Sequence, residues 1–322
     1  MQELRWNPLL GTYTMVAANR QQRPHLQKNT CPFCPGSTQI PEAYDVLAYP
    51  NDFPVLSQSP PTPKPTLPPY HSLPSHGACE VLLYDPNHTA SMADFSIEKI
   101  KRILQLWQDR WLWFQQQPNV QYIFIFENKG EEVGVTMHHP HGQLYAYPFL
   151  PLKLQIELDN CRTYWQQHQR NLWDDMLQAE ISEKERLVAE NEEFLAFIPY
   201  FNDYPYGVYI VARSPIHCLA QFEDIHFTQL AQLLQSVTKA FDSLFQRPFP
   251  YMMGVYQTPV NMPAYAEAAH YYRWHIAFYP PLRAADKIKW NASSETGAWA
   301  AANPRSVEEC AAQLRHLILD KC

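Results

Sequence analysis

The amino-acid sequence contains the same series of segments twice, and this repetition constrains the fold more than any other feature. Residues 49–54 read Tyr-Pro-Asn-Asp-Phe-Pro, and residues 200–205 read Tyr-Phe-Asn-Asp-Tyr-Pro. A weaker pair follows in the same order, at residues 85–88 and 214–217. Because self-similar segments in the same order indicate repeated structural units, we expect two modules built to one plan.

Each repeat continues with the same predicted elements. Apolar residues recur at helical spacing over residues 97–114 and 227–244, which predicts one amphipathic helix in each half. Two strands should follow each helix, at residues 121–126 and 134–147 in the first half and 251–256 and 271–279 in the second. A helical connection rich in Gln, Asp and Glu is expected over residues 152–187. The sequence therefore predicts an α+β fold of two modules.

Composition narrows the class of partner. The 322 residues carry a formal net charge of -7, which argues against binding to nucleic acid through clustered Lys and Arg. No uncharged apolar stretch is long enough to span a bilayer, and the N-terminus has no signal-peptide core. Seven scattered cysteines do not resemble a secreted disulfide framework. We expect a cytoplasmic protein that acts on small molecules, without a membrane or nucleic-acid partner.

Residues 138–143, which read His-His-Pro-His-Gly-Gln, narrow the chemistry most. In an extended segment His139 and His141 share one face, whereas His138 points the other way. Gly142 has no Cβ and would let a ligand approach the backbone, and the Gln143 amide can donate to a phosphoryl oxygen. The pattern predicts phosphoryl transfer with a histidine as the nucleophile.

Cys31 and Cys34 have the spacing that allows two thiolates to bind one zinc ion. His88 and His139 are the candidates for the other two ligands of a tetrahedral site. Taken alone, the pair could also be a redox couple or two ordinary thiols. If His139 binds zinc, the metal fixes the strand that carries His141, so its role would be architectural, without an open position for substrate.

These motifs together resemble the galactose-1-phosphate uridylyltransferases, a branch of the histidine-triad superfamily. The resemblance runs over nearly the whole chain, and its main segments are residues 19–24, 51–53, 126–130, 139–143 and 275–283. It implies two tandem histidine-triad-like domains, each an antiparallel sheet with packed helices. Residues 1–153 would form the catalytic domain, with one structural zinc ion, and residues 154–322 would complete the sugar pocket.

The resemblance also implies an activity and a role for each site residue. His141 would attack the α-phosphorus of UDP-glucose, release glucose 1-phosphate and pass the uridylyl group to galactose 1-phosphate in a ping-pong reaction. Gln143 and Thr136 would hold phosphoryl oxygens. The other substrate contacts implied are Asn128 at the phosphates, Arg20, Arg23, Asn51 and Asp52 around the nucleotide, and Lys289 and Glu295 at the hexose. Members of this family are commonly homodimers.

The chain departs from the family at a second metal site. Many members use a glutamate and three histidines there; Glu157 and His275 match two of these ligands, but Tyr256 and Ala277 replace the others. We therefore predict that the second metal is absent.

Two other functions fit the same motifs. An ADP-glucose phosphorylase-like enzyme would transfer an adenylyl group with the same zinc set and nucleophile. A non-catalytic nucleotide-sugar-binding protein would keep the pocket without turnover. The labelled nucleotide found on His141 would distinguish these alternatives.

Overall fold

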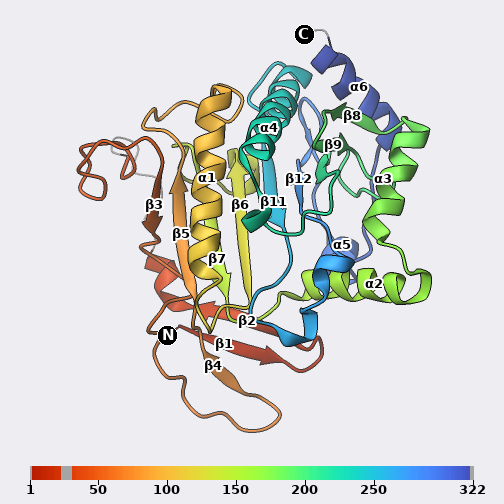
Figure 1. Ribbon diagram of the computed structural model, residues 1–322. Helices are drawn as coiled ribbons and strands as arrows, with labels where there is room; N and C mark the ends of the chain where they lie inside the picture. The colour runs from red at the N-terminus through yellow and green to blue at the C-terminus, as the bar shows by residue number, and fades with distance from the viewer. Residues whose placement is uncertain (1, 23–30, 320–322) are drawn as a thin grey trace.

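The computed structural model describes residues 2–22 and 31–319. Within them, nine antiparallel strands form one sheet in the order β3-β5-β7-β6-β11-β12-β10-β9-β8 (Figure 1). The strands of the first half are β1 (Gln2–Asn7), β2 (Thr12–Ala17), β3 (Leu47–Pro50), β4 (Ser72–Pro74), β5 (Ala78–Leu83), β6 (Tyr122–Lys129) and β7 (His141–Tyr147). Those of the second half are β8 (Leu187–Glu190), β9 (Phe194–Phe197), β10 (Tyr209–Ala212), β11 (Tyr251–Tyr256), β12 (His275–Tyr279), β13 (Leu282–Ala284) and β14 (Lys287–Ile288).

The two predicted modules are present, and their sheets are continuous. Strands β6 and β11 meet at the centre as an antiparallel pair in which Phe126 lies opposite Gly254. On one side of this pair lie β7, β5 and β3, and on the other lie β12, β10 and β9. Each half therefore has the same strand order from the centre outward, as expected from the repeat. Backbone pairing across the junction leaves neither central strand with an exposed edge.

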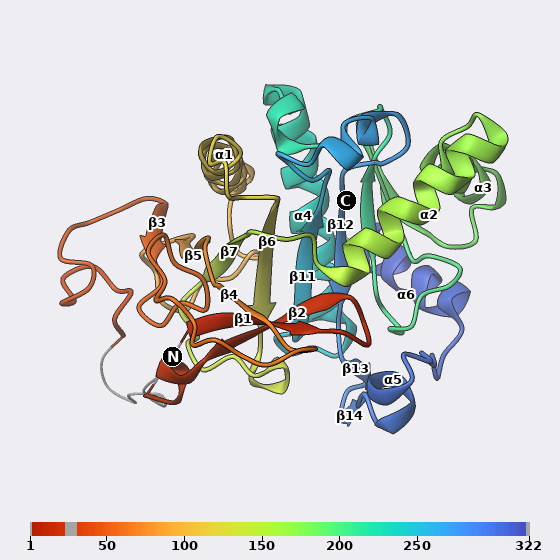
Figure 2. The ribbon, with the colours of Figure 1, turned by 90° about the horizontal axis from the view of Figure 1, so that it is seen from below.

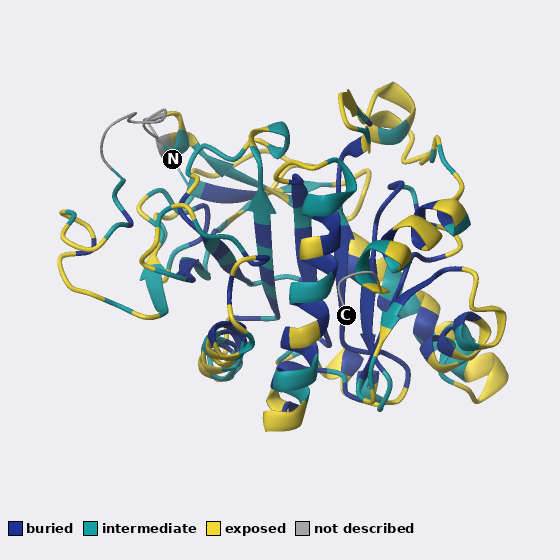
Figure 3. Cartoon of the chain, turned by 90° about the horizontal axis from the view of Figure 1, so that it is seen from above, coloured by how far each residue is buried: buried dark blue, intermediate teal, exposed yellow. Residues whose placement is uncertain are grey.

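The predicted helices α1 (Ile97–Phe114) and α4 (Asp224–Leu244) pack against each other on one face of the sheet (Figures 1 and 2). Ser96 begins α1 by accepting a hydrogen bond from the Lys99 backbone N–H at 3.2 Å, which satisfies one free donor of the first turn. The apolar stripe of α1, with Trp107 and Trp111 at its centre, is buried in the largest hydrophobic core. Figure 3 shows the buried side of both helices turned toward the sheet. This arrangement confirms the amphipathic prediction.

The other face of the sheet is covered by two smaller layers. A three-stranded sheet of β2, β1 and β4 covers the first half. The connection between the halves forms α2 (Leu152–His168) and α3 (Leu172–Glu183), which pack on the second half through Leu158, Trp173 and Leu177. The chain ends with α5 (Ser293–Gly297) and α6 (Val307–Leu319), and the latter packs on α4 and β8. None of the helices in the described ranges could cross a membrane.

Candidate active site and metal centre

His141 begins strand β7 and faces away from the two long helices. Leu144 and Ala146 on the same strand lie in the core beneath α1 and α4, so the side chains of His141 and Gln143 project from the opposite face. A strand was predicted over residues 134–147, but the observed strand β7 begins only at His141. Pro140 has no N–H to donate to a neighbouring strand, so His139 lies in the bend before β7.

A hydrogen bond to the backbone orients the His141 imidazole. Nδ1 of His141 lies 2.6 Å from the carbonyl oxygen of His139, a group that can only accept. The proton is therefore on Nδ1, and the lone pair is on Nε2. The Phe33 ring packs at 5.6 Å from the His141 ring and 6.2 Å from the His139 ring. This buried side chain, between the two cysteines, supports both histidines.

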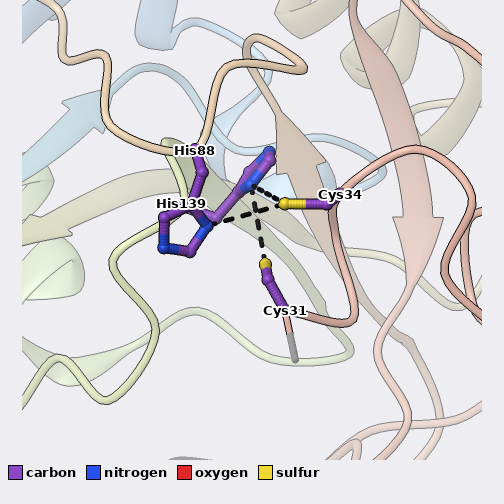
Figure 4. A group of neighbouring side chains, drawn as sticks. All are labelled: Cys31, Cys34, His88 and His139. Carbon is purple, nitrogen blue, oxygen red and sulfur yellow. Dashed lines mark hydrogen bonds between the residues drawn. The ribbon is translucent and has the colours of Figure 1, made fainter. Parts of the chain in front are cut away.

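The four predicted metal ligands lie together (Figure 4). Sγ of Cys31 and Sγ of Cys34 are each 3.6 Å from Nδ1 of His139, and Sγ of Cys34 is 3.7 Å from Nδ1 of His88. Zinc bonds of about 2.3 Å to sulfur and about 2.0 Å to nitrogen place such ligands about 3.6 Å apart in a tetrahedron. The donor set and its spacing therefore fit one zinc ion with all four positions filled by protein.

Tyr44 holds His139 in the form that can bind a metal. Its hydroxyl lies 2.6 Å from Nε2 of His139 and 3.0 Å from the carbonyl oxygens of Phe33 and Asp85. The Tyr44 hydroxyl has one proton, which it donates to a carbonyl oxygen, because a carbonyl can only accept. Nε2 of His139 therefore donates to the Tyr44 oxygen, and Nδ1 keeps its lone pair toward the cysteines. Burial lowers the pKa of His139 to about 4, which keeps the ring neutral. No sequence motif marked Tyr44, because it meets His139 only through the tertiary fold.

The residues predicted around the nucleotide approach β7 from both sides. Asn128 follows Phe126 on the face of β6 that carries Gln143 on β7, since Phe126 and Gln143 are directly paired. From the other side, the Asn51 backbone N–H donates to the carbonyl of Cys79 on β5 at 3.0 Å. Cys79 is paired with Tyr145 of β7.

The remaining residues predicted to contact the nucleotide or its phosphates are Arg20, Asp52, Thr136 and Arg23. Arg20, in a short 3₁₀ helix (Ala18–Gln22), is near enough to Cys79 for its charge to lower the thiol pKa, although burial raises that pKa overall. Asp52 accepts a hydrogen bond from the Tyr49 hydroxyl at 2.8 Å. Thr136 lies in the loop before β7. Arg23 lies outside the described residues.

The two residues predicted to contact the hexose belong to the second half. Lys289 is buried, with Nζ 3.8 Å from the Asp203 carboxylate and 4.5 Å from the centre of the Tyr204 ring. Glu295 in α5 accepts a hydrogen bond from the Ala292 backbone N–H at 3.1 Å. The contacts described for both side chains are all within the second half.

The second half contains a histidine placed like His141. Nδ1 of His275 lies 3.0 Å from the carbonyl oxygen of Arg273, two residues earlier, as in the first half. This ring is fully enclosed: it stacks on Tyr256 at 4.8 Å and contacts Trp173 at 4.3 Å. Burial lowers the pKa of His275 to about 3. The aromatic rings fill the space that a substrate would need, so the corresponding position in the second half is a packed core.

A lysine lies beside the residues compared with the second metal site. Nζ of Lys153 is 3.6 Å from the Glu157 carboxylate and 2.8 Å from the Tyr279 hydroxyl. The Glu157 carboxylate also accepts a hydrogen bond from Tyr272 at 3.1 Å. An ammonium group next to Glu157 would repel a divalent cation. The absence of a second metal stays a prediction, and this contact gives it a physical reason.

Comparison with known proteins connects this geometry to one family. The sequence models of the galactose-1-phosphate uridyl transferase N-terminal and C-terminal domains match residues 1–151 and 157–290. The galactose-1-phosphate uridylyltransferase of Thermotoga maritima is 38% identical over 317 residues, which cover 98% of each chain. The probable galactose-1-phosphate uridylyltransferase of Drosophila melanogaster is 30% identical, over 86% of this chain and 84% of its own.

Solved structures agree with the sequence comparison. A uridylyltransferase mutant superimposes with a TM-score of 0.91 at 28% identity, over 100% of this chain and 99% of its own. An ADP-glucose phosphorylase from Arabidopsis thaliana has a TM-score of 0.75 at 21% identity, over 97% of both chains, and shares the fold. From the matches to both domains and the extent of the identity, we conclude that this chain belongs to the galactose-1-phosphate uridylyltransferase family.

Proposed function

We propose that this chain transfers a uridylyl group from UDP-glucose to galactose 1-phosphate through a covalent uridylyl-His141 intermediate. The observation that carries this proposal is the 2.6 Å hydrogen bond from Nδ1 of His141 to the His139 carbonyl. It leaves the Nε2 lone pair as the nucleophilic atom on the face that also carries Gln143 and Asn128. Membership of the family supplies the substrate class.

The reaction has two displacements at one phosphorus atom. Nε2 of His141 attacks the α-phosphorus of UDP-glucose, and the bond to the bridging oxygen breaks to release glucose 1-phosphate. A phosphate oxygen of galactose 1-phosphate then attacks the same phosphorus and regenerates the neutral imidazole as UDP-galactose forms. Splitting the transfer in this way is covalent catalysis, and it predicts ping-pong kinetics.

Side chains beside His141 would stabilise the negative charge of the phosphoryl oxygens in the transition state. We assign the Gln143 amide and the Thr136 hydroxyl to the α-phosphoryl oxygens and Asn128 to the adjoining phosphate. Preorganised donors of this kind lower the barrier because they need not reorient during the reaction. We assign Arg20, Arg23, Asn51 and Asp52 to the nucleotide.

The metal centre has a positioning role in this scheme. Cys31, Cys34, His88 and His139 would hold zinc, and the ion when bound would act as a structural cross-link. His139 then has two functions, because its ring binds the metal while its carbonyl orients His141. Zinc thus fixes the group that sets the nucleophile's tautomer.

We assign catalysis to residues 1–153 and completion of the sugar pocket to residues 154–322. Lys289 and Glu295 would reach the hexose of a neighbouring subunit in a homodimer. The exposed side chains of Trp290 and Trp299, which flank α5 with 70% and 59% of their surface accessible, support burial of this segment against a second copy. Light scattering on the purified protein tests this, since a monomer at assay concentration would exclude a shared pocket.

Labelling with two nucleotide sugars tests the proposed activity. The protein is incubated with UDP-glucose or ADP-glucose carrying ³²P at the α-position, digested, and its modified peptide is sequenced by mass spectrometry. We expect a uridylyl group on His141 and none in the His141→Ala variant. Labelling by ADP-glucose alone would instead assign an adenylyltransferase. Binding of UDP-glucose without labelling or exchange would assign a nucleotide-sugar-binding protein.

A further inference from the structure

A buried carboxyl group lies directly beneath the strand that carries the proposed nucleophile. In the β6–β7 register, Glu127 is paired with Gly142, the residue between His141 and Gln143. Paired residues project to the same face, so the Glu127 side chain lies on the α1 side of the sheet while His141 and Gln143 lie on the other. Glu127 is only 6% exposed. An ionisable group so deep in an apolar core requires an explanation.

The Glu127 carboxyl has one firm hydrogen bond. The Tyr251 hydroxyl donates to Oε1 at 2.6 Å, whereas Oε2 has no hydrogen-bond partner. The hydroxyl of Tyr84 and the indole N–H of Trp107 are also buried without a partner of standard geometry. Glu127 and Tyr84 are nevertheless close enough for each to shift the other's pKa. A proton on the carboxyl would let it both accept from Tyr251 and donate toward Tyr84.

The surroundings of Glu127 favour this protonated form. Burial raises its pKa to about 7, although the Tyr251 hydroxyl, the Lys129 ammonium and Tyr84 each lower it. Lys129 is neutralised in turn by Asp242 of α4, with its Nζ 3.0 Å and 3.1 Å from the carboxylate oxygens. The other groups around Glu127 are uncharged: the phenols of Tyr251 on β11 and Tyr84 directly after β5, and the indole of Trp107 on α1.

Tyr84 touches the catalytic motif on both sides of His141. A Cβ built on Gly142 would lie 2.1 Å from the Tyr84 hydroxyl oxygen, so this oxygen occupies the space where a side chain would be. The Tyr84 backbone N–H donates to the Pro140 carbonyl at 3.1 Å. The residue therefore contacts the chain directly before and directly after the nucleophile. Its hydroxyl packs against Gly142 on the α1 face of the sheet, whereas the side chains of His141 and Gln143 project from the opposite face.

We propose that Glu127 and Tyr84 are positioning residues for His141: the neutral carboxyl holds the Tyr84 hydroxyl against Gly142, and this contact sets the position of His141 and Gln143. The inference rests on the proposed role of His141 as the nucleophile. It assigns a function to a buried acid on the side of the sheet that the substrate does not reach.

Four variants test this assignment. Tyr84→Phe removes one oxygen atom, and Tyr122→Phe is its matched control, because Tyr122 is also a buried tyrosine of this sheet but bonds to the Gln257 backbone. Glu127→Gln keeps the shape and hydrogen-bonding pattern of the neutral acid, and Glu127→Leu removes them. For each variant we measure zinc content, melting temperature, UDP-glucose affinity and the rate of glucose 1-phosphate release in a single turnover.

Tyr84→Phe should lower the release rate about tenfold, with less than a twofold change in affinity and a fall in melting temperature similar to that of Tyr122→Phe, which also leaves a buried group without its hydrogen bond. Glu127→Leu should show a similar loss of rate, and Glu127→Gln should restore it to within about threefold of the wild type. Tyr122→Phe should keep the wild-type rate. A wild-type rate in Tyr84→Phe, or equal losses in Glu127→Gln and Glu127→Leu, would overturn the proposal.

A second measurement does not depend on the substrate. With ¹⁵N-labelled histidine, the His141 ring resonances are assigned by comparison with His141→Ala. They should shift in Tyr84→Phe and stay in place in Tyr122→Phe. If the wild type releases no glucose 1-phosphate, the proposed function fails, and these spectra still decide the positioning role. Unchanged His141 resonances in Tyr84→Phe would refute it.

Discussion

Replacing Glu127 by glutamine should make stability less dependent on pH. The folded-state pKa of Glu127 is about 7, against an ordinary value of 4.5. A carboxyl whose pKa is raised on folding favours the folded state in its neutral form. Its contribution is therefore complete below the unfolded pKa and is lost as the pH rises toward 7. The difference of 2.5 units corresponds to about 3 kcal/mol, of which about 2.5 kcal/mol is lost between pH 5 and pH 8.

Urea unfolding of the wild type and Glu127→Gln at pH 5 and pH 8 measures this loss. The stability of Glu127→Gln relative to the wild type should increase by about 2.5 kcal/mol between the two pH values, because glutamine does not ionise. Other titrating groups, including the zinc ligands, are common to both proteins and cancel in the comparison. An unchanged difference would show that Glu127 is not a neutral acid in the folded protein, and the reasoning from its burial would fail.

Three further substitutions examine the site itself. Tyr44→Phe should weaken zinc binding about tenfold or more in competition with a chromophoric chelator, because His139 loses the partner that fixes its tautomer; unchanged affinity would contradict this. His141→Gly should abolish transfer from UDP-glucose but keep zinc, and a preformed uridylyl-imidazole should restore product formation. Gly142→Ala should destabilise the protein by about 1–3 kcal/mol in urea unfolding, since its methyl group collides with Tyr84; wild-type stability would show that the core yields there.

Local sequence patterns were sufficient for the two long helices and for the ligand types, whereas most strands of the large sheet were not predicted and β12 begins at His275, not at residue 271. The spacing of apolar residues predicted α1 and α4, because a helix that packs on a sheet must bury one stripe of its surface. The spacing of Cys31 and Cys34, taken together with His88 and His139, predicted a metal site, and the structure brings the four side chains together. The start of a strand was harder to predict: β7 was expected from residue 134, but Pro140 has no N–H to donate, and pairing with the neighbouring strands begins only at His141.

By itself, the sequence determined the two-module plan, the class of chemistry and the set of candidate residues, since these depend on residue types and their spacing along the chain. Only the tertiary structure decided which groups meet across long separations. It joined the two sheets at β6 and β11, placed Tyr44 against His139, and put Glu127 and Tyr84 beneath Gly142. A carboxyl in an otherwise ordinary strand sequence becomes a buried acid only when other segments exclude water from it.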